Sequence, residues 1–157
     1  MIALVPSVFD RTTGAGDFSQ MIEDPAYADA LFIYNDNEVQ SAAFLNQVEA
    51  GETPTECAAG GGNAAVRPYQ CADPPRAAGV PTGPGWRSLA DGKAAIDRAL
   101  VHVERLLATG RYDRVIYSAM GEDQLDVLGA AIFSPPPEVL SYVPAQLRRI
   151  ADAANAA

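Results

Sequence analysis

The sequence predicts one α/β domain spanning residues 1–157. Two apolar segments, residues 30–34 and 114–118, are each followed by a polar loop, as is typical of buried strands in a parallel sheet. Residues 88–110 and the chain after residue 137 repeat apolar side chains at helical spacing. Strands that alternate with helices predict an α/β sheet, and the length suits one hydrophobic core.

The first third of the chain predicts shorter elements. Residues 2–5 predict a strand that ends at Pro6, because proline cannot donate a backbone hydrogen bond. Residues 18–28 predict a short or broken helix, since Pro25 interrupts the apolar pattern. A further helix is expected over residues 38–50, before a glycine and a proline stop it.

The remaining segments predict loops and two amphipathic helices. Residues 72–86 hold many prolines and are expected to form a loop rather than a helix or central strand. Residues 119–129 predict an acidic loop, and residues 130–133 a short helical turn or strand. The helical stripes expected to face the core comprise Ile96, Leu100, Val103 and Leu107 in one helix and Val139, Val143, Leu147 and Ile150 in the other.

Composition limits the partners of the chain. Eleven basic and twenty acidic residues give a formal charge of −9, which disfavours coating of nucleic acid and binding to anionic membranes. A small phosphorylated ligand remains compatible, because backbone N–H groups at glycine turns bind phosphate without side-chain charge. No stretch approaches the roughly twenty apolar residues of a membrane span, so we expect a cytoplasmic protein.

Few residues are suited to metal or triad chemistry. Cys57 and Cys71 flank a glycine-rich stretch; we expect free thiols, with a disulfide as the alternative. His102, the one histidine, falls off the apolar stripe of its helix and is expected at the surface. A zinc site therefore lacks ligands, and we expect no metal or cofactor to be required. Trp86 could stack on a base or anchor a pocket rim.

Three loops point to a binding site. Residues 35–40, 60–67 and 118–129 follow or neighbour the predicted strands, and the carboxyl ends of parallel strands meet at one edge of a sheet. A run of three glycines permits close backbone approach to a ligand, although a flexible surface loop has the same composition. The sequence therefore predicts that these loops converge on a nucleotide.

The order of motifs resembles the macrodomain family. Gly16-Asp17-Phe18 is followed by a strand ending in Asn35-Asp36-Asn37, and then by Gly60-Gly61-Gly62-Asn63. The resemblance implies a three-layer domain with a mixed, largely parallel central sheet flanked by helices. It also implies binding of ADP-ribose or a related NAD-derived nucleotide.

The resemblance assigns roles to individual residues. Asp17 would receive the adenine amino group beside Phe18, and Asn37 would approach the distal ribose. Arg67 either pairs with a phosphate or forms an ordinary salt bridge. Asn35 and Ser118 belong to the same binding set. The loops around the ribose and diphosphate would comprise Gly60, Gly61, Gly62 and Asn63 on one side and Gly129, Ala130, Ala131, Ile132 and Phe133 on the other.

Departures from the family favour binding over catalysis. Tyr34 stands where the motif begins with Asn, and Ala64 stands where hydrolytic members often carry an acid. We therefore expect a reader or sequestering protein. One alternative is a hydrolase of ADP-ribosyl compounds that uses an acid of residues 122–126 or Asp36, although Asp36 could equally cap the next helix. A second alternative is a protein-interaction module without a small ligand, whose partner the sequence leaves open.

Overall fold

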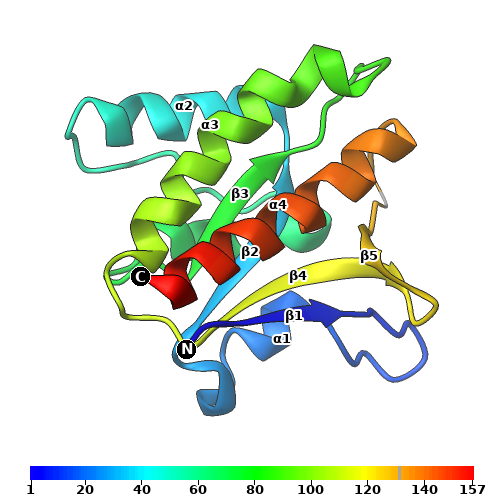
Figure 1. Ribbon diagram of the computed structural model, residues 1–157, viewed down its shortest axis with the longest axis horizontal. Coiled ribbons are helices and arrows are strands. Elements are labelled where there is room, and N and C mark those ends of the chain that lie inside the picture. Colours follow the sequence, from blue (N-terminus) through cyan, green and yellow to red (C-terminus); the bar gives the residue numbers. More distant parts are fainter. Residues whose placement is uncertain (131) are drawn as a thin grey trace.

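The computed structural model describes every residue of the chain except residue 131. It is an α/β domain, as the sequence predicts (Figure 1). The elements in chain order are β1 (Ala3–Ser7), α1 (Phe18–Met21), the 3₁₀ helix η1 (Pro25–Tyr27), β2 (Ala30–Asp36), α2 (Glu38–Glu49), the 3₁₀ helix η2 (Gly62–Cys71), β3 (Ala77–Pro81), α3 (Leu89–Leu107), β4 (Arg114–Gly121), β5 (Gln124–Leu128) and α4 (Pro137–Ala156).

The sheet is mixed and largely parallel, which confirms the expected architecture. Strands β1, β4, β2 and β3 lie side by side in that order, and each neighbouring pair is parallel. Strand β5 pairs antiparallel with the last residues of β4. Because the four parallel strands share one direction, their carboxyl ends meet at one edge of the sheet.

Helices cover both faces of the sheet and make three layers. Side chains of β2 alternate between the faces: Leu31 and Ile33 pack in a core with α2, α3 and α4, while Phe32 and Tyr34 pack in a second core with α1 and η2. Figure 1 shows α3 and α4 crossing the same face of the sheet. The predicted apolar stripes of both helices are buried in the first core.

One predicted strand end and two predicted loops are wrong in part. Strand β1 runs through Pro6 to Ser7, which is possible because β1 is an edge strand. The proline-rich residues 72–86 contain β3, in which Pro81 is the last residue. Strand β3 lies at the edge of the parallel strands opposite β1. The expected acidic loop at 119–129 is instead a β-hairpin of β4 and β5.

Two smaller predictions concern the segments beside these strands. Residues 18–28 form a broken helix, as expected, since α1 and η1 are separate. Ala130, Ile132 and Phe133 belong to no helix or strand, and Ala131 lies outside the described residues. The expected helical turn or strand is therefore not found in the described part of this segment.

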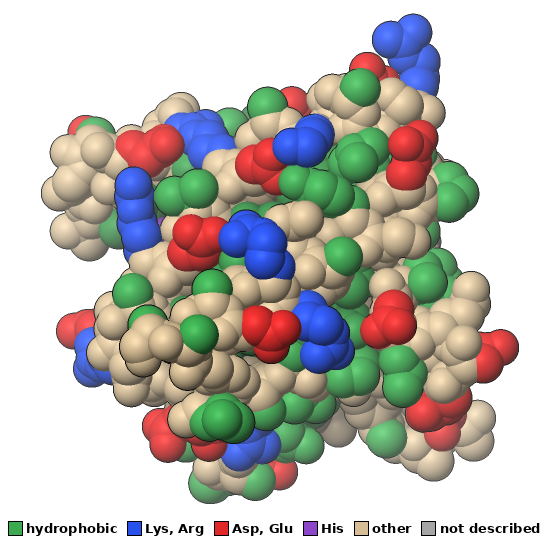
Figure 2. All heavy atoms as spheres, in the orientation of Figure 1, with side chains coloured by type: hydrophobic (Ala, Val, Ile, Leu, Met, Phe, Trp, Pro, Cys, Tyr) green, Lys and Arg blue, Asp and Glu red, His purple; other side chains and the backbone are tan. Residues whose placement is uncertain are grey.

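Charged side chains are dispersed on the face that carries α3 and α4. Figure 2 shows basic and acidic groups interspersed there rather than gathered by sign. Several are paired, including Lys93 with Asp97 and Arg149 with Glu104. No helix among the described residues is long and apolar enough to cross a bilayer.

Candidate functional site

A cavity of about 770 Å³ lies at the carboxyl edge of the sheet, where the three predicted loops converge. Its walls also include residues that follow β1 and β3, so all four parallel strands contribute. Most of the sequence-predicted residues line it: Asp17, Asn35, Asp36, Asn37, Gly60, Gly61, Gly62, Asn63, Arg67, Ser118, Gly129, Ala130, Ile132 and Phe133.

The floor of the cavity holds a buried ion pair. Arg67 on η2 donates from Nη2 to Oδ1 of Asp36 at the end of β2, over 2.5 Å. Asp36 Oδ1 also accepts the Asn37 N–H at 2.8 Å. Arg67 Nη1 donates to the carbonyl of Ala58 at 3.1 Å. Arg67 thus joins the glycine-rich loop to the central strand.

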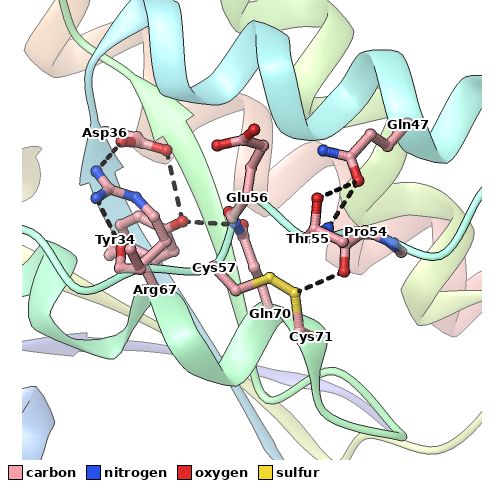
Figure 3. The surroundings of a disulfide bond; sticks show 11 residues. Tyr34, Asp36, Gln47, Pro54, Thr55, Glu56, Cys57, Arg67, Gln70 and Cys71 are labelled. Atoms are coloured by element: carbon pink, nitrogen blue, oxygen red, sulfur yellow. Dashed lines mark hydrogen bonds and ion pairs between the residues drawn. A yellow bond between two sulfur atoms is a disulfide. The ribbon is translucent and has the colours of Figure 1, made fainter.

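Tyr34 and Gln70 extend this network beneath the loop. The Tyr34 hydroxyl lies 2.9 Å from Gln70 Oε1 and 3.4 Å from Asp36 Oδ2 (Figure 3). A side chain on Gly79 would place its Cβ 2.8 Å from Asp36 Oδ2 and 2.9 Å from the Tyr34 hydroxyl. Glycine on the neighbouring strand therefore makes room for the network.

Electrostatics keep this network in defined ionisation states. Burial raises the pKa of Tyr34, and the charge of Asp36 raises it further, so the phenol stays neutral. Burial acts to lower the pKa of Arg67. The hydrogen bond to Asp36 and the charge of Asp36 outweigh burial, so the pKa of Arg67 is raised above its ordinary value. Arg67 therefore stays charged beside Asp36, and the Asp36 side chain, held by Arg67 and the Asn37 N–H, is neither a helix cap nor an unengaged base.

The glycine-rich loop is shaped by close packing. A side chain on Gly60 would place its Cβ 2.7 Å from Arg67 Nη1, so only glycine fits over the guanidinium. Gly62 has φ +58°, a conformation that side chains disfavour. Gly61 precedes η2 and provides no side-chain cap, so the first N–H groups of η2 lack a capping side chain.

The second loop crosses the cavity from the β-hairpin. Asn35 donates from Nδ2 to the carbonyl of Gly129 at 2.7 Å, which links the ends of β2 and β5. The Gly129 N–H donates to the carbonyl of Ser118 at 2.8 Å. Ile132 lies over the first loop, since a Cβ on Gly62 would meet its Cδ1 at 3.2 Å. The two loops face one another across the site.

The α2 end of the cavity is held by Asn37. Its side-chain oxygen accepts the Gln40 N–H at 2.8 Å and caps α2. The helix cap that the sequence offered to Asp36 therefore belongs to the next residue. Asn37 still lines the cavity, together with Gln40 and Thr82.

The end of the cavity nearest β1 includes residues that the sequence analysis missed. Phe9 and Arg11 line it with Asp17, which caps α1 by accepting the Ser19 N–H at 2.9 Å. Gly16 brings the two segments together, because a Cβ there would lie 3.1 Å from the Phe9 Cα. Phe9 is 49% exposed. The sequence feature that could have identified these residues is an aromatic and a basic side chain, Phe9 and Arg11, shortly after the strand β1.

Three residues considered from the sequence lie outside the cavity walls. Phe18 is buried in the core, edge-on to Phe32, because it is the first residue of α1 and faces the sheet. Trp86 packs against Gly92 and donates to Glu38 Oε2 at 3.0 Å, so it is an anchor rather than a stacking surface. His102 is half-buried against Phe44, which corrects its expected surface position.

The two cysteines form a disulfide, so the expectation of free thiols is wrong. Their Cα atoms are 6.1 Å apart, a usual separation for a bridge. The spacing of fourteen positions is compatible with free thiols and with a disulfide. In the folded chain the end of η2 lies beside the segment that leads into the glycine loop, which brings the two cysteines together (Figure 3). Among the described residues, no group of three acidic, histidine or cysteine side chains is arranged to hold a metal ion.

The fold and the cavity define an α/β domain with a glycine-lined pocket at the carboxyl edge of a largely parallel sheet. Comparison of the chain with protein-family models, with curated proteins and with solved structures finds no match in any of the three. Functional inference therefore depends on the site itself.

Proposed function

We propose that the chain binds ADP-ribose or a related NAD-derived nucleotide and acts as a reader or sequestering protein. The observation that carries this proposal is the glycine-lined cavity, formed by loops after all four parallel strands. Ligands of open α/β sheets bind at this edge, where backbone N–H groups are available to anions. The resemblance of the motif order to macrodomains supplies the ligand class.

The dimensions of the site suit an extended nucleotide. Four neighbouring parallel strands, spaced about 4.8 Å apart, spread their ends over roughly 14 Å. The cavity of about 770 Å³ falls within the usual range for small-molecule sites. A ligand with a base at the β1 end and a sugar at the β3 end would span this length, with its phosphates beneath the two loops.

The charge distribution supports binding through the backbone. Asp36 offsets the charge of Arg67, and Arg67 lies beneath the glycine loop rather than in open solvent. The uncapped N–H groups at the start of η2 are thus the main donors for phosphate oxygens. Arg11 supplies a cation at the β1 end, and the part of the chain that the structure describes offers it no ion-pair partner.

Binding is proposed ahead of hydrolysis because of the position of Asp36. A general base needs a lone pair directed at water or substrate. Asp36 has a side-chain exposure of 1%, and its Oδ1 is occupied by Arg67 and by the Asn37 N–H. This geometry fixes a charge within the wall of the site and leaves the carboxylate poorly placed for proton transfer.

Isothermal titration of the purified protein with ADP-ribose tests the proposal. Cyclic ADP-ribose isomers, NAD and AMP are comparison ligands. We expect saturable binding of ADP-ribose that Asp17→Ala and Asn37→Ala each weaken. Absence of heat and of thermal stabilisation with every ligand would overturn the proposal and favour a protein-interaction module. Turnover of an ADP-ribosyl substrate that Asp36→Ala abolishes would favour the hydrolase instead.

A further inference from the structure

The segment that leads into the glycine-rich loop has no regular secondary structure of its own. Residues 52–61 connect α2 to η2 as irregular chain. Two side-chain hydrogen bonds from η2 hold this segment: Gln70 Nε2 donates to the Glu56 carbonyl at 2.6 Å, and Arg67 Nη1 donates to the Ala58 carbonyl at 3.1 Å. A backbone bond adds to them, since the Gly60 N–H donates to the Ala64 carbonyl of η2 at 3.0 Å. The position of the loop therefore depends on its attachment to η2.

The disulfide is the covalent attachment between the same two segments. Cys57 precedes the glycines, and Cys71 is the last residue of η2. The bridge closes a ring of chain that contains residues 60–62 and Arg67, the part of the cavity wall assigned to phosphate binding. Figure 3 shows the bridge beside Gln70, on the side of the network away from Asp36. The bridge limits any movement of the segment around Cys57 away from η2.

A reductant in solution has access to the bridge. Cys71 is exposed and Cys57 is half-buried. A thiolate can therefore attack the exposed Cys71 sulfur, and the half-buried Cys57 sulfur acts as the leaving group. Bridges that stabilise a fold in a reducing compartment are rare, whereas those that respond to reductant are often regulatory.

We propose that the Cys57–Cys71 disulfide is a redox switch of the nucleotide site. This inference rests on the proposed function. A dithiol reductant breaks the sulfur–sulfur bond, each cysteine gains one electron and one proton, and the two thiols of the reductant become a disulfide. The oxidised protein holds the glycine loop in its binding position. The reduced protein releases the segment around Cys57 and binds the nucleotide more weakly.

The remaining hydrogen bonds hold the reduced segment only in part, although they include the backbone bond from the Gly60 N–H to the Ala64 carbonyl. Each competes with water, and a single hydrogen bond of this kind contributes modestly to stability. Freed chain gains conformational entropy that the bridge had removed. If the loop is competent about a tenth of the time after reduction, the Kd for ADP-ribose rises about tenfold. The fold itself is retained, because both hydrophobic cores lie outside the ring closed by the bridge except at Ala64, Val66 and Tyr69.

The experiment measures ADP-ribose binding by calorimetry to the oxidised protein and to the protein reduced with dithiothreitol. The variant Cys57→Ser plus Cys71→Ser is the matched control, titrated with and without reductant. Limited proteolysis of each ligand-free form follows the release of residues 52–61 directly. Circular dichroism shows that reduced and variant proteins remain folded, and alkylation followed by mass measurement counts the free thiols.

We expect a Kd about tenfold higher in the reduced protein, a similarly weak double variant that ignores reductant, and faster cleavage within residues 52–61 in both. Equal affinity of oxidised and reduced protein overturns the redox switch and leaves the proposed function intact. A reductant effect that persists in the double variant also overturns it. No binding by the oxidised protein overturns the proposed function, and the switch with it.

Discussion

Arg67 and Asp36 form a buried ion pair, with Nη2 and Oδ1 2.5 Å apart, directly beneath the glycine-rich loop. The two residues stand 31 positions apart in the chain. Their side chains are 7% and 1% exposed, so neither charge is well solvated. The pair ties η2 to the end of β2 beneath the glycine-rich loop.

Removal of one partner should strongly destabilise the fold. Arg67→Met leaves the Asp36 carboxylate buried without its counterion, and Asp36→Leu leaves the guanidinium in the same state. We expect a loss of about 3–5 kcal/mol in the free energy of unfolding for each, measured by urea denaturation. The double variant should lose clearly less than the sum of the two. Additive losses would show that the pair is not coupled in solution.

Two neighbouring glycines offer a matched test of the loop. Gly60→Ala places a Cβ 2.7 Å from Arg67 Nη1 and 3.0 Å from the Ala64 Cβ, whereas Gly61→Ala meets Ile132 at an ordinary 3.4 Å. We expect Gly60→Ala to lower the unfolding free energy by about 1–3 kcal/mol through overpacking. Gly61→Ala should change it by less than about 0.5 kcal/mol. Equal effects would contradict the packing of Arg67 against Gly60.

Arg11 should contribute to binding of an anionic ligand. Arg11→Ala removes an exposed cation from the β1 end of the cavity, and we expect about a fivefold higher Kd for ADP-ribose at low salt. The difference should shrink as the salt concentration rises, because salt screens exposed charges. Arg148→Ala is the control, since it removes an exposed charge on α4. A similar loss in both variants would indicate only a general charge effect.

His102 should make stability depend on pH near neutrality. Burial lowers the pKa of His102, and the charge of Arg105 lowers it further. The unfolded chain therefore binds the proton more readily than the folded protein. The contribution of His102 to the free energy of unfolding should be fully present above about pH 6.5, the ordinary pKa of histidine. It should be lost as the pH falls from that value toward the lower pKa of the folded state.

Urea denaturation between pH 7.5 and 5.5 measures this dependence. The chain has a single histidine, so His102→Gln should remove the change over this range. An unaltered pH dependence in that variant would assign the effect to acidic side chains instead. The comparison of the unaltered protein with His102→Gln requires no ligand.

The sequence was sufficient to predict much of the architecture. Apolar runs at 30–34 and 114–118 mark the two central strands, because a strand buried on both faces needs continuous apolar residues. The hairpin was missed because β5 is short and mostly exposed, with the polar residues Gln124 and Asp126 on it. Strand β3 was missed because its flanking prolines resemble a loop, and its pairing with β2 provides the stability that local sequence does not.

The candidate site was predictable in outline but not in its contacts. Polar residues after β2 and β4 indicated convergence, since the ends of parallel strands meet at one edge. The ion pair of Asp36 with Arg67 depends on how η2 folds over β2, which no local pattern specifies. Phe18 was placed in the ligand set by motif alone. In the structure its side chain is buried in the core, with an exposed fraction of 1%.

Amide hydrogen exchange with and without ADP-ribose tests the central claim most directly, because it locates the ligand as well as detecting it. We expect slower exchange on binding at residues 60–63 and 35–40, which line the cavity, and unchanged exchange along α4. Unchanged exchange everywhere, or protection confined to residues away from the carboxyl edge of the sheet, would contradict a nucleotide site in this cavity.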